Sequence, residues 1–333
     1  MIFGSVPLSQ AQGAVLAHSL RVGGGMLRKG IVLTGGHLAA MADGGVQNVM
    51  VARLEEGDVP EDEAAHALAQ AACGAGLRVA AAGTGRCNLY ADAAGLLRVD
   101  AAAVDAANAV DEALTLATPP DYARLAEGQL AATAKVIPYA APRDALDRAA
   151  GVLSGALTLH PFRPLHAGLI VTGTEGQKQS VIDKGIRAVV DRLAALGSDA
   201  PDAVVLAHDE GALAEGIRAA LRPGPDLLLI LSATATSDRH DIAPAAIVDA
   251  GGTIERFGMP VDPGNLLVLA RIGDIPAIVL PGCARSPALN GADWVLERLA
   301  ARLPVTGRDI AGMGVGGLLK EMPGRPHPRE TRP

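Results

Sequence analysis

Hydroxyl-bearing and charged side chains gather between residues 232 and 241, directly after the apolar run Leu227–Leu231. Asp238 and Asp241, with His240 between them, offer the oxygen ligands that Mg²⁺ takes together with phosphates and waters. The pattern therefore predicts Asp238 and Asp241 as metal ligands. A second interpretation stays open, because Asp241 is also placed to cap a helix that begins at Ile242, and a cap does not exclude a functional role.

A second candidate site is the segment Leu280-Pro281-Gly282-Cys283-Ala284-Arg285-Ser286-Pro287. Gly282 permits a tight strand-to-helix turn, and Ser286 before Pro287 is typical of an N-cap followed by proline at the first helical position. Free backbone N–H groups, the helix dipole and Arg285 would then converge on one anion. A well-capped helix with no ligand explains the same residues, so both interpretations stay open.

The elements that must position these segments alternate regularly after residue 166. We expect strands at 167–172, 203–207 and 227–231, helices at 181–196, 212–221 and 242–250, then paired strands at 266–270 and 277–280 and a helix at 287–301. This alternation predicts right-handed βαβ units, hence an α/β domain whose mostly parallel sheet carries helices on both faces. Ligands bind at the carboxyl ends of the strands in such folds. A third polar segment, from Thr172 to Asp183, also follows a strand there.

The residues before Pro161-Phe162-Arg163-Pro164 mix both kinds of element without regular alternation. Residues 64–73 and 101–113 read as helices, and 48–54 and 130–139 as strands, which predicts α+β architecture. Gly83-Thr84-Gly85-Arg86 is interpreted as a turn. We expect an α+β domain at 1–160, the α/β domain at 161–303 and a flexible tail at 304–333, in which Gly312–Gly317 is a connector.

The composition argues against several classes of function. A net charge of −7 and 2% aromatic residues disfavour a nucleic-acid-binding surface. Three scattered cysteines form no disulfide framework or C-x-x-C metal site. The apolar run 227–231 is far shorter than the roughly 20 residues of a membrane span, so we expect no membrane association and a cytoplasmic location.

Three motifs, taken in order, resemble those of one family. They are Asp183-Lys184-Gly185-Ile186, Asp238-Arg239-His240-Asp241-Ile242-Ala243-Pro244, and Leu280-Pro281-Gly282 with Ser286. Over roughly residues 166–303 the chain resembles the molybdopterin-binding domain shared by molybdopterin adenylyltransferases and molybdopterin molybdenumtransferases. The resemblance implies a molybdopterin-binding-like fold, molybdopterin as ligand, and Mg²⁺ and ATP as candidate cofactors. The implied activity is adenylylation of the pterin phosphate or insertion of molybdate.

The resemblance also implies roles for single residues. Asp183 and Asp241 match acidic positions around the pterin and nucleotide phosphates and are the expected catalytic residues. Gly282 and Ser286 match the turn that holds the terminal phosphate of molybdopterin. Where the family's second loop carries glycines, this chain has hydroxyls, which would take over as donors. The expected cofactor-binding residues are Thr172, Ser232, Thr234, Thr236, Arg239, Pro281, Gly282, Arg285 and Ser286.

Two further segments extend the resemblance. Residues 257–265 look like the proline-glycine loop of the molybdenumtransferases, which lies beside the same site. The first 150 residues resemble standalone and nucleotidyltransferase-fused molybdopterin-binding proteins, through residues 29–34, 108–112 and 135–138. The implied partners are a molybdenum cofactor cytidylyltransferase or an apo-molybdoenzyme, and the implied assembly is a homo-oligomer.

Two alternatives to an enzyme of molybdenum cofactor biosynthesis stay open. The first is a non-catalytic carrier that hands molybdopterin or the finished cofactor to a partner enzyme. The second is an unrelated nucleotide-binding α/β protein that would bind ATP with no pterin requirement. A dinucleotide-binding fold is disfavoured, because no G-x-G-x-x-G motif lies on a first strand-to-helix turn.

Overall fold

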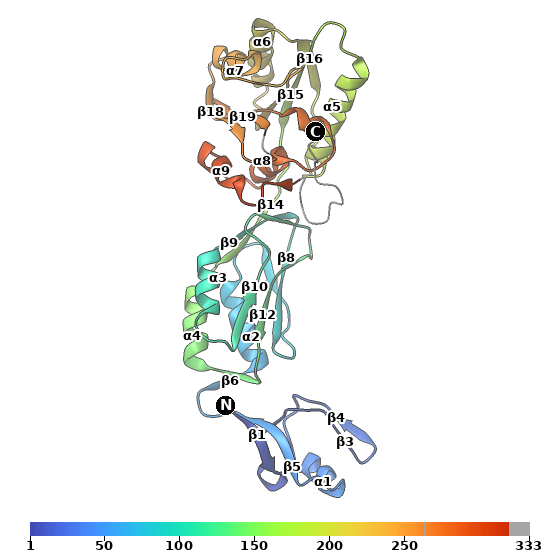
Figure 1. The fold of residues 1–333 in the computed structure, drawn as a ribbon, viewed down its shortest axis with the longest axis vertical. Helices are drawn as coiled ribbons and strands as arrows, with labels where there is room; N and C mark the ends of the chain where they lie inside the picture. Colours follow the sequence, from blue (N-terminus) through green and yellow to red (C-terminus); the bar gives the residue numbers. More distant parts are fainter. Residues whose placement is uncertain (263, 320–333) are drawn as a thin grey trace, which may run out of the picture. The chain divides into compact units, whose positions relative to one another are not determined.

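The computed structural model describes residues 1–262 and 264–319 (Figure 1). The chain divides into two compact units, the first spanning Met1–Pro161 and the second beginning at Phe162. This division falls inside the proline-flanked segment Pro161-Phe162-Arg163-Pro164, where the sequence predicts a boundary. Within residues 1–262 and 264–319, each sheet takes its strands from one unit.

The first part of the first unit is a small antiparallel sheet with one helix. Its sheet has the order β1-β5-β2, and its core holds Leu16, Leu33, Met41 and Val51. The elements are β1 (Ile2–Pro7), the 3₁₀ helix η1 (Leu8–Gln10), β2 (Val15–Leu16), β3 (Leu20–Val22), β4 (Gly25–Leu27), α1 (Gly35–Asp43) and β5 (Asn48–Arg53).

The rest of the first unit packs three helices with antiparallel sheets around a second core, which contains Leu68, Leu89, Leu114 and Leu146. Its sheets have the orders β10-β12-β8-β7, β11-β9-β14 and β13-β6. The elements are β6 (Asp58–Pro60), α2 (Glu61–Ala72), β7 (Leu77–Val79), β8 (Arg86–Ala91), β9 (Gly95–Val99), α3 (Ala101–Asn108), β10 (Leu114–Ala117), β11 (Ala123–Leu125), β12 (Leu130–Val136), β13 (Ala140–Pro142), α4 (Arg143–Val152) and β14 (Leu157–Pro161). The predicted α+β character of this unit is confirmed.

The turn predicted at Gly83–Arg86 is also present, and its polar groups are satisfied from within the unit. The Gly85 N–H donates to the Asp62 carboxylate at 2.6 Å, and the Lys135 ammonium donates to the Thr84 carbonyl at 2.7 Å. Because a carboxylate of the protein already occupies this N–H group, the turn is structural.

The second unit is built on one six-stranded sheet with the order β16-β15-β17-β20-β19-β18. Strands β16, β15, β17 and β20 run parallel, while β19 and β18 run antiparallel to their neighbours. The elements are β15 (Ala167–Gly173), α5 (Gln179–Ala194), β16 (Ala203–Ala207), α6 (Glu210–Leu221), β17 (Leu227–Leu231), α7 (Ile242–Asp249), β18 (Thr253–Met259), β19 (Asn265–Ile272), β20 (Ile275–Val279), η2 (Gly282–Arg285), α8 (Gly291–Ala300), α9 (Gly307–Ala311) and η3 (Gly312–Gly314). The predicted α/β class is confirmed.

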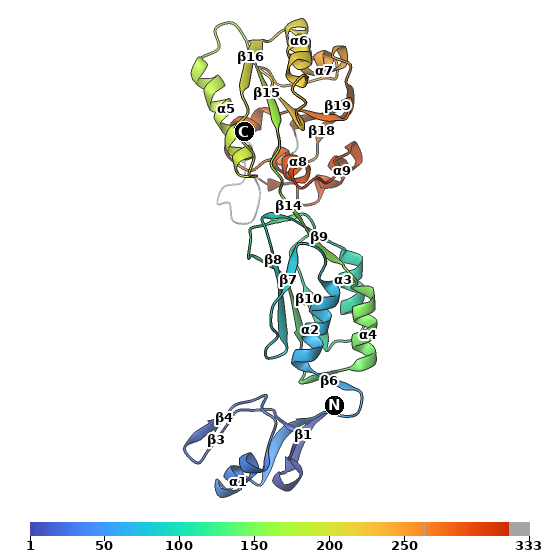
Figure 2. The same cartoon turned by 180° about the vertical axis from the view of Figure 1, so that it is seen from behind.

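Helices cover both faces of this sheet, as Figures 1 and 2 show from opposite sides. The central strand β17 is buried along its whole length, and its side chains alternate between two cores. Leu227, Leu229 and Leu231 pack with α5 and α8, whereas Leu228 and Ile230 pack with α6 and α7. A short, wholly apolar strand is what such two-sided burial requires.

The first residues of the tail expected at 304–333 are packed in the structure. Helix α9 follows Thr306, whose side chain forms a capping box with Asp309, and Ile310 and Met313 are buried in the core shared by α5 and α8. Burial of these apolar side chains holds residues 304–314 against the second unit. Residues 320–333 of the expected tail lie outside the described residues.

Candidate functional site

The loops that carry the sequence-predicted site residues all leave the same edge of the six-stranded sheet. Thr172 lies near the carboxyl end of β15, residues 232–241 follow β17, and residues 280–290 follow β20. The strand registers align Val171 with Leu231 and Ile230 with Val279, so these carboxyl ends lie side by side. The β18–β19 turn reaches this edge too, because Met259 pairs with Asn265 and Val268 with Val279. One residue of that turn, 263, lies outside the described residues.

Residues 232–234 are held from three strand ends, Ser232 and Ala233 through their backbone and Thr234 through its side chain. The Arg285 guanidinium, beyond β20, donates to the Ser232 carbonyl at 2.6 Å. The Thr172 hydroxyl, on β15, accepts the Ala233 N–H at 2.8 Å. Beyond β16, Nε2 of His208 lies 2.9 Å from the Thr234 hydroxyl. This first part of the loop is therefore a fixed structure, with Ser232 buried and Thr234 exposed.

Arg285 places a partly buried cation next to this loop. Burial lowers the pKa of its guanidinium, and its Nη1 atom is buried with no hydrogen-bond partner among the described residues. Nη2 is held by the Ser232 carbonyl. A guanidinium that is half satisfied by neutral protein groups stabilises negative charge placed near it, because a low-dielectric surrounding strengthens the attraction.

Gly185 in α5 gives Arg285 the space it occupies. A Cβ atom at Gly185 would lie 2.7 Å from Cδ2 of Leu231 and 3.0 Å from Nη1 of Arg285. The glycine of the Asp183-Lys184-Gly185-Ile186 motif is therefore explained by close packing of α5 on the guanidinium. Gly282 is the opposite case, because a Cβ atom there would meet nothing within 4 Å.

The two aspartates of the second loop have separate partners. The Asp241 carboxylate accepts the Ser237 N–H at 2.9 Å and the Ile242 N–H at 2.8 Å, and it is the N-cap of α7. The Asp238 carboxylate accepts both the backbone N–H and Nδ1 of His240, each at 2.8 Å. These hydrogen bonds, led by the backbone one, lower the pKa of Asp238.

Within residues 1–262 and 264–319, no group of three or more His, Cys, Asp or Glu side chains forms a metal cage. Of the two predicted Mg²⁺ ligands, Asp238 is exposed, while both carboxylate oxygens of Asp241 accept backbone N–H groups. Asp183 belongs to a different element, the second turn of α5, where its carboxylate accepts the Gln179 amide at 2.9 Å. The remaining predicted binding residues differ in burial: Thr236 and Pro281 are buried, while Arg239 and Gly282 are exposed.

The predicted helix start at Ser286 and Pro287 is wrong. Ser286 has extended backbone dihedrals after η2, and α8 begins at Gly291 with Asn290 as its N-cap. The reason is Arg192, a buried residue of α5 that donates to the carbonyls of Ala284 (2.9 Å), Ser286 (2.6 Å) and Ala288 (3.1 Å). Those carbonyls are turned toward a guanidinium, so the helix starts after them. The predicted convergence of a helix dipole at Ser286 is absent.

Two residues of this region were not predicted from the sequence. Arg192 also forms a buried ion pair with Asp293 at 2.7 Å, and nothing in the local pattern distinguishes it from a surface arginine of an amphipathic helix. His208 was detectable, since it comes directly after the predicted strand 203–207, at a carboxyl strand end.

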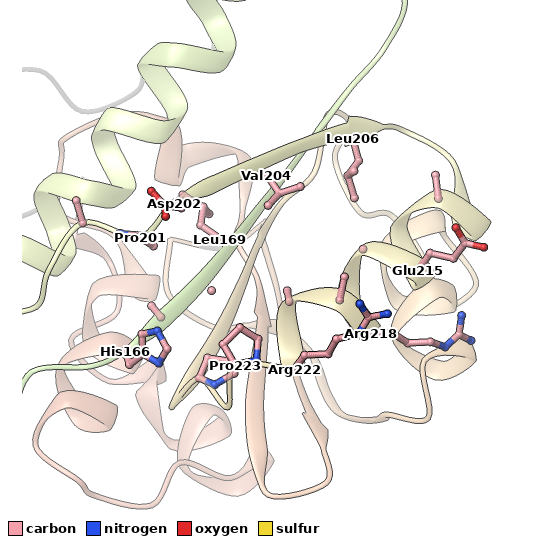
Figure 3. A pocket seen from close by; sticks show the side chains of 18 residues that line it. His166, Leu169, Pro201, Asp202, Val204, Leu206, Glu215, Arg218, Arg222 and Pro223 are labelled. Carbon is pink, nitrogen blue, oxygen red and sulfur yellow. The ribbon is translucent and has the colours of Figure 1, made fainter.

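A groove of 1090 Å³ lies elsewhere on the second unit (Figure 3). It is bounded by the amino end of β15 at His166, by Val204 and Leu206 of β16, and by α6 residues such as Glu215 and Arg218. None of the sequence-predicted site residues lines it.

Residues 5–53 match the model of a domain of unknown function (DUF8806). No curated protein matches the sequence. Similar solved structures include a molybdenum cofactor biosynthesis protein B, at 16% identity and a TM-score of 0.32, over 43% of this chain and 96% of that one. They also include the molybdopterin biosynthesis MoeA protein from Pyrococcus horikosii, at 12% identity and a TM-score of 0.31, over 92% of this chain and 76% of that one. A molybdenum cofactor biosynthesis protein from Pyrococcus furiosus is similar at 12% identity and a TM-score of 0.23, over 93% of this chain and 65% of that one.

No helix among the described residues combines the length and apolarity needed to cross a membrane.

Proposed function

We propose that the second unit binds molybdopterin at the carboxyl edge of its sheet, and that the protein acts in molybdenum cofactor biosynthesis. The observation that carries the proposal is the anchoring of residues 232–234 by Arg285, Thr172 and His208. This anchoring supports a ligand site because it fixes a hydroxyl-rich loop next to a partly buried guanidinium. The three motifs that resemble the molybdopterin-binding family lie on segments at or next to the same edge.

The terminal phosphate of the pterin is the group that this edge suits best. Arg285 supplies positive charge, the exposed Thr234 hydroxyl supplies a donor, and the space above Gly282 is open. A phosphate is attracted by the positive charge of Arg285 and accepts the hydroxyl hydrogen of Thr234. Thr172 and Ser232 are buried, so their part is to shape the loop, and they do so through the Ala233 N–H and the Ser232 carbonyl.

Two reactions fit this ligand. In adenylylation, a phosphate oxygen of molybdopterin attacks the α-phosphorus of ATP, a new P–O bond forms, and pyrophosphate leaves. In molybdate insertion, the adenylylated pterin takes up molybdate, water cleaves the P–O–P bond between the pterin phosphate and adenylate, and adenylate leaves. Mg²⁺, when bound by Asp238 and Asp241, would neutralise phosphate charge in either reaction. Asp183 would orient the same phosphates from α5.

The test is anaerobic incubation of the protein with molybdopterin, ATP and Mg²⁺, followed by mass analysis of the protein-bound pterin. An adenylylated product establishes the adenylyltransferase reaction. If the bound pterin is unmodified, the protein is next incubated with adenylylated pterin and molybdate. Release of adenylate in that incubation establishes insertion. Binding of ATP without any binding of pterin, or binding of neither, overturns the proposal.

A carrier function is the second candidate, and the state of Asp241 favours it. Both of its carboxylate oxygens already accept backbone N–H groups at the start of α7, which is a structural use of the side chain. Asp183→Asn and Asp241→Asn separate the two functions, since asparagine retains helix-capping ability. A carrier keeps both its affinity and its full function in each variant. An enzyme keeps its affinity and loses turnover by about 100-fold or more, as expected when groups that act in the transition state are removed.

A further inference from the structure

A continuous chain of hydrogen bonds joins three elements at the candidate site. It runs from the Ala233 N–H to the Thr172 hydroxyl (2.8 Å), from that hydroxyl to Nδ1 of His208 (3.0 Å), and from Nε2 of His208 to the Thr234 hydroxyl (2.9 Å). Thr172 is fully buried, and Thr234 is exposed. The His208 backbone is itself fixed, because its N–H donates to the Gly173 carbonyl at 2.9 Å.

Burial of Thr172 sets the direction of this chain. Its hydroxyl accepts the Ala233 N–H, so its own hydrogen needs an acceptor, and among its described contacts Nδ1 of His208 is that acceptor. A buried hydroxyl hydrogen without an acceptor costs free energy. Nδ1 is therefore unprotonated, and a neutral imidazole then carries its hydrogen on Nε2. Nε2–H donates to Thr234, whose hydroxyl hydrogen is left to point away from His208.

We propose that His208 is a positioning residue that holds Thr234 as a hydrogen-bond donor toward an anionic oxygen of the bound ligand. Resting on the proposed function, that oxygen belongs to the phosphate of molybdopterin. In the opposite direction, the Thr234 hydroxyl would donate to His208 and turn only its lone pairs toward the ligand. Those lone pairs would repel an anionic phosphate oxygen. The opposite direction would also leave the buried Thr172 hydrogen without an acceptor.

The first test needs no ligand. Nitrogen-15 spectra of histidine side chains distinguish a ring protonated at Nε2 from one protonated at Nδ1. The signal of His208 is assigned by its disappearance in His208→Gln. The expected result is the Nε2–H form in the ligand-free protein at neutral pH. An Nδ1–H ring overturns the proposal, whether or not the protein binds molybdopterin.

The second test compares two replacements of His208 in anaerobic titrations with molybdopterin. The amide nitrogen of glutamine reaches the place of Nε2 and can still donate to Thr234. The amide oxygen of asparagine reaches the place of Nδ1 and accepts the Thr172 hydroxyl hydrogen, but asparagine does not reach Thr234. The proposal predicts that His208→Gln stays within about threefold of the natural affinity, whereas His208→Asn weakens binding by about 10- to 100-fold, the range for a hydrogen bond to a charged group. A purely structural role, in which only support of the buried Thr172 matters, predicts the reverse order.

Variants of the exposed Thr234 keep the proposal falsifiable if either His208 variant folds poorly. Thr234→Val removes the hydroxyl at nearly constant shape and is expected to weaken binding by about 10- to 100-fold, while Thr234→Ser retains affinity. His166→Gln, at the amino end of β15, is the matched control and leaves affinity unchanged. Equal affinities of the Val and Ser variants overturn the positioning role. If the natural protein binds no pterin, the proposed function fails. The nitrogen-15 spectra of His208 then decide the direction of the hydrogen bonds without a ligand.

Discussion

At the scale of single residues, Gly185 is tightly packed, whereas Gly282 faces open space. Gly185→Ala would press a methyl group against Leu231 and Arg285, which is held by Ser232. Overpacking costs about 1–3 kcal/mol, more than the roughly 1 kcal/mol that alanine returns in a helix. We therefore expect the second unit to lose about 1 kcal/mol of unfolding free energy. Urea denaturation followed by fluorescence of Trp294, the one tryptophan of the sequence, measures this.

Gly211→Ala in α6 is the control for that prediction, since the nearest atom to its Cβ would be a carboxylate oxygen at an ordinary 3.4 Å. It should leave stability unchanged or raise it slightly. A Gly185→Ala variant as stable as Gly211→Ala would show that α5 does not pack on Arg285 as closely as the structure has it.

Asp226 provides a pH-dependent contribution on the opposite edge of the sheet. Its pKa is lowered, first by the His166 N–H that its carboxylate accepts and then by Arg302. A lowered folded-state pKa stabilises the protein above the unfolded value, about 3.9, and this contribution disappears as the pH falls through the folded value. Asp226→Asn should thus cost about 1 kcal/mol at pH 7, allowing for solvent screening, and progressively less below pH 5. Parallel urea curves by Trp294 fluorescence from pH 7 to pH 3 would show this, and a constant difference would contradict it.

At the scale of elements, the strands and helices of the second unit follow from local pattern, but the segment between β20 and α8 does not. The wholly apolar run Leu227–Leu231 is enough to predict a buried strand, because its burial depends on its own side chains. The start of α8 depends instead on Arg192, about a hundred residues earlier, whose contacts no local pattern contains. The three anchors of residues 232–234 are equally non-local, so the edge of the sheet was predictable and the arrangement of the loop on it was not.

This dependence makes Arg192 the residue that holds the segment 284–288 in place. Arg192→Met would leave the carbonyls of Ala284, Ser286 and Ala288, together with Asp293, without their common donor. Removing one partner of a buried ion pair costs about 3–5 kcal/mol. We expect that loss in the second unit, together with faster protease cleavage at 284–288. Arg187→Met, an exposed arginine on the same helix, should change neither, and a small loss in Arg192→Met would mean that water replaces the guanidinium.

At the scale of the whole molecule, each sheet of the described residues takes its strands from one unit, and each unit has hydrophobic cores of its own. All sequence-predicted site residues lie in the second unit, from Thr172 to Ser286. A compact unit with its own core can in principle fold alone. We therefore predict that a fragment from Phe162 to Pro333 folds cooperatively, with a Trp294 fluorescence transition in urea within about 1 M of that of the full chain.

The same fragment decides which unit carries pterin affinity. If the loops at the edge of the sheet are sufficient, the fragment binds molybdopterin within about tenfold of the full chain, which is about 1.4 kcal/mol. The matched experiment is the fragment Met1–Pro161, which contains none of those loops and should show no saturable binding. A cooperatively folded second unit with no affinity, beside a full chain that binds, would show that the first unit contributes ligand contacts. The motifs that follow β15, β17 and β20 along the chain would then describe only part of the site.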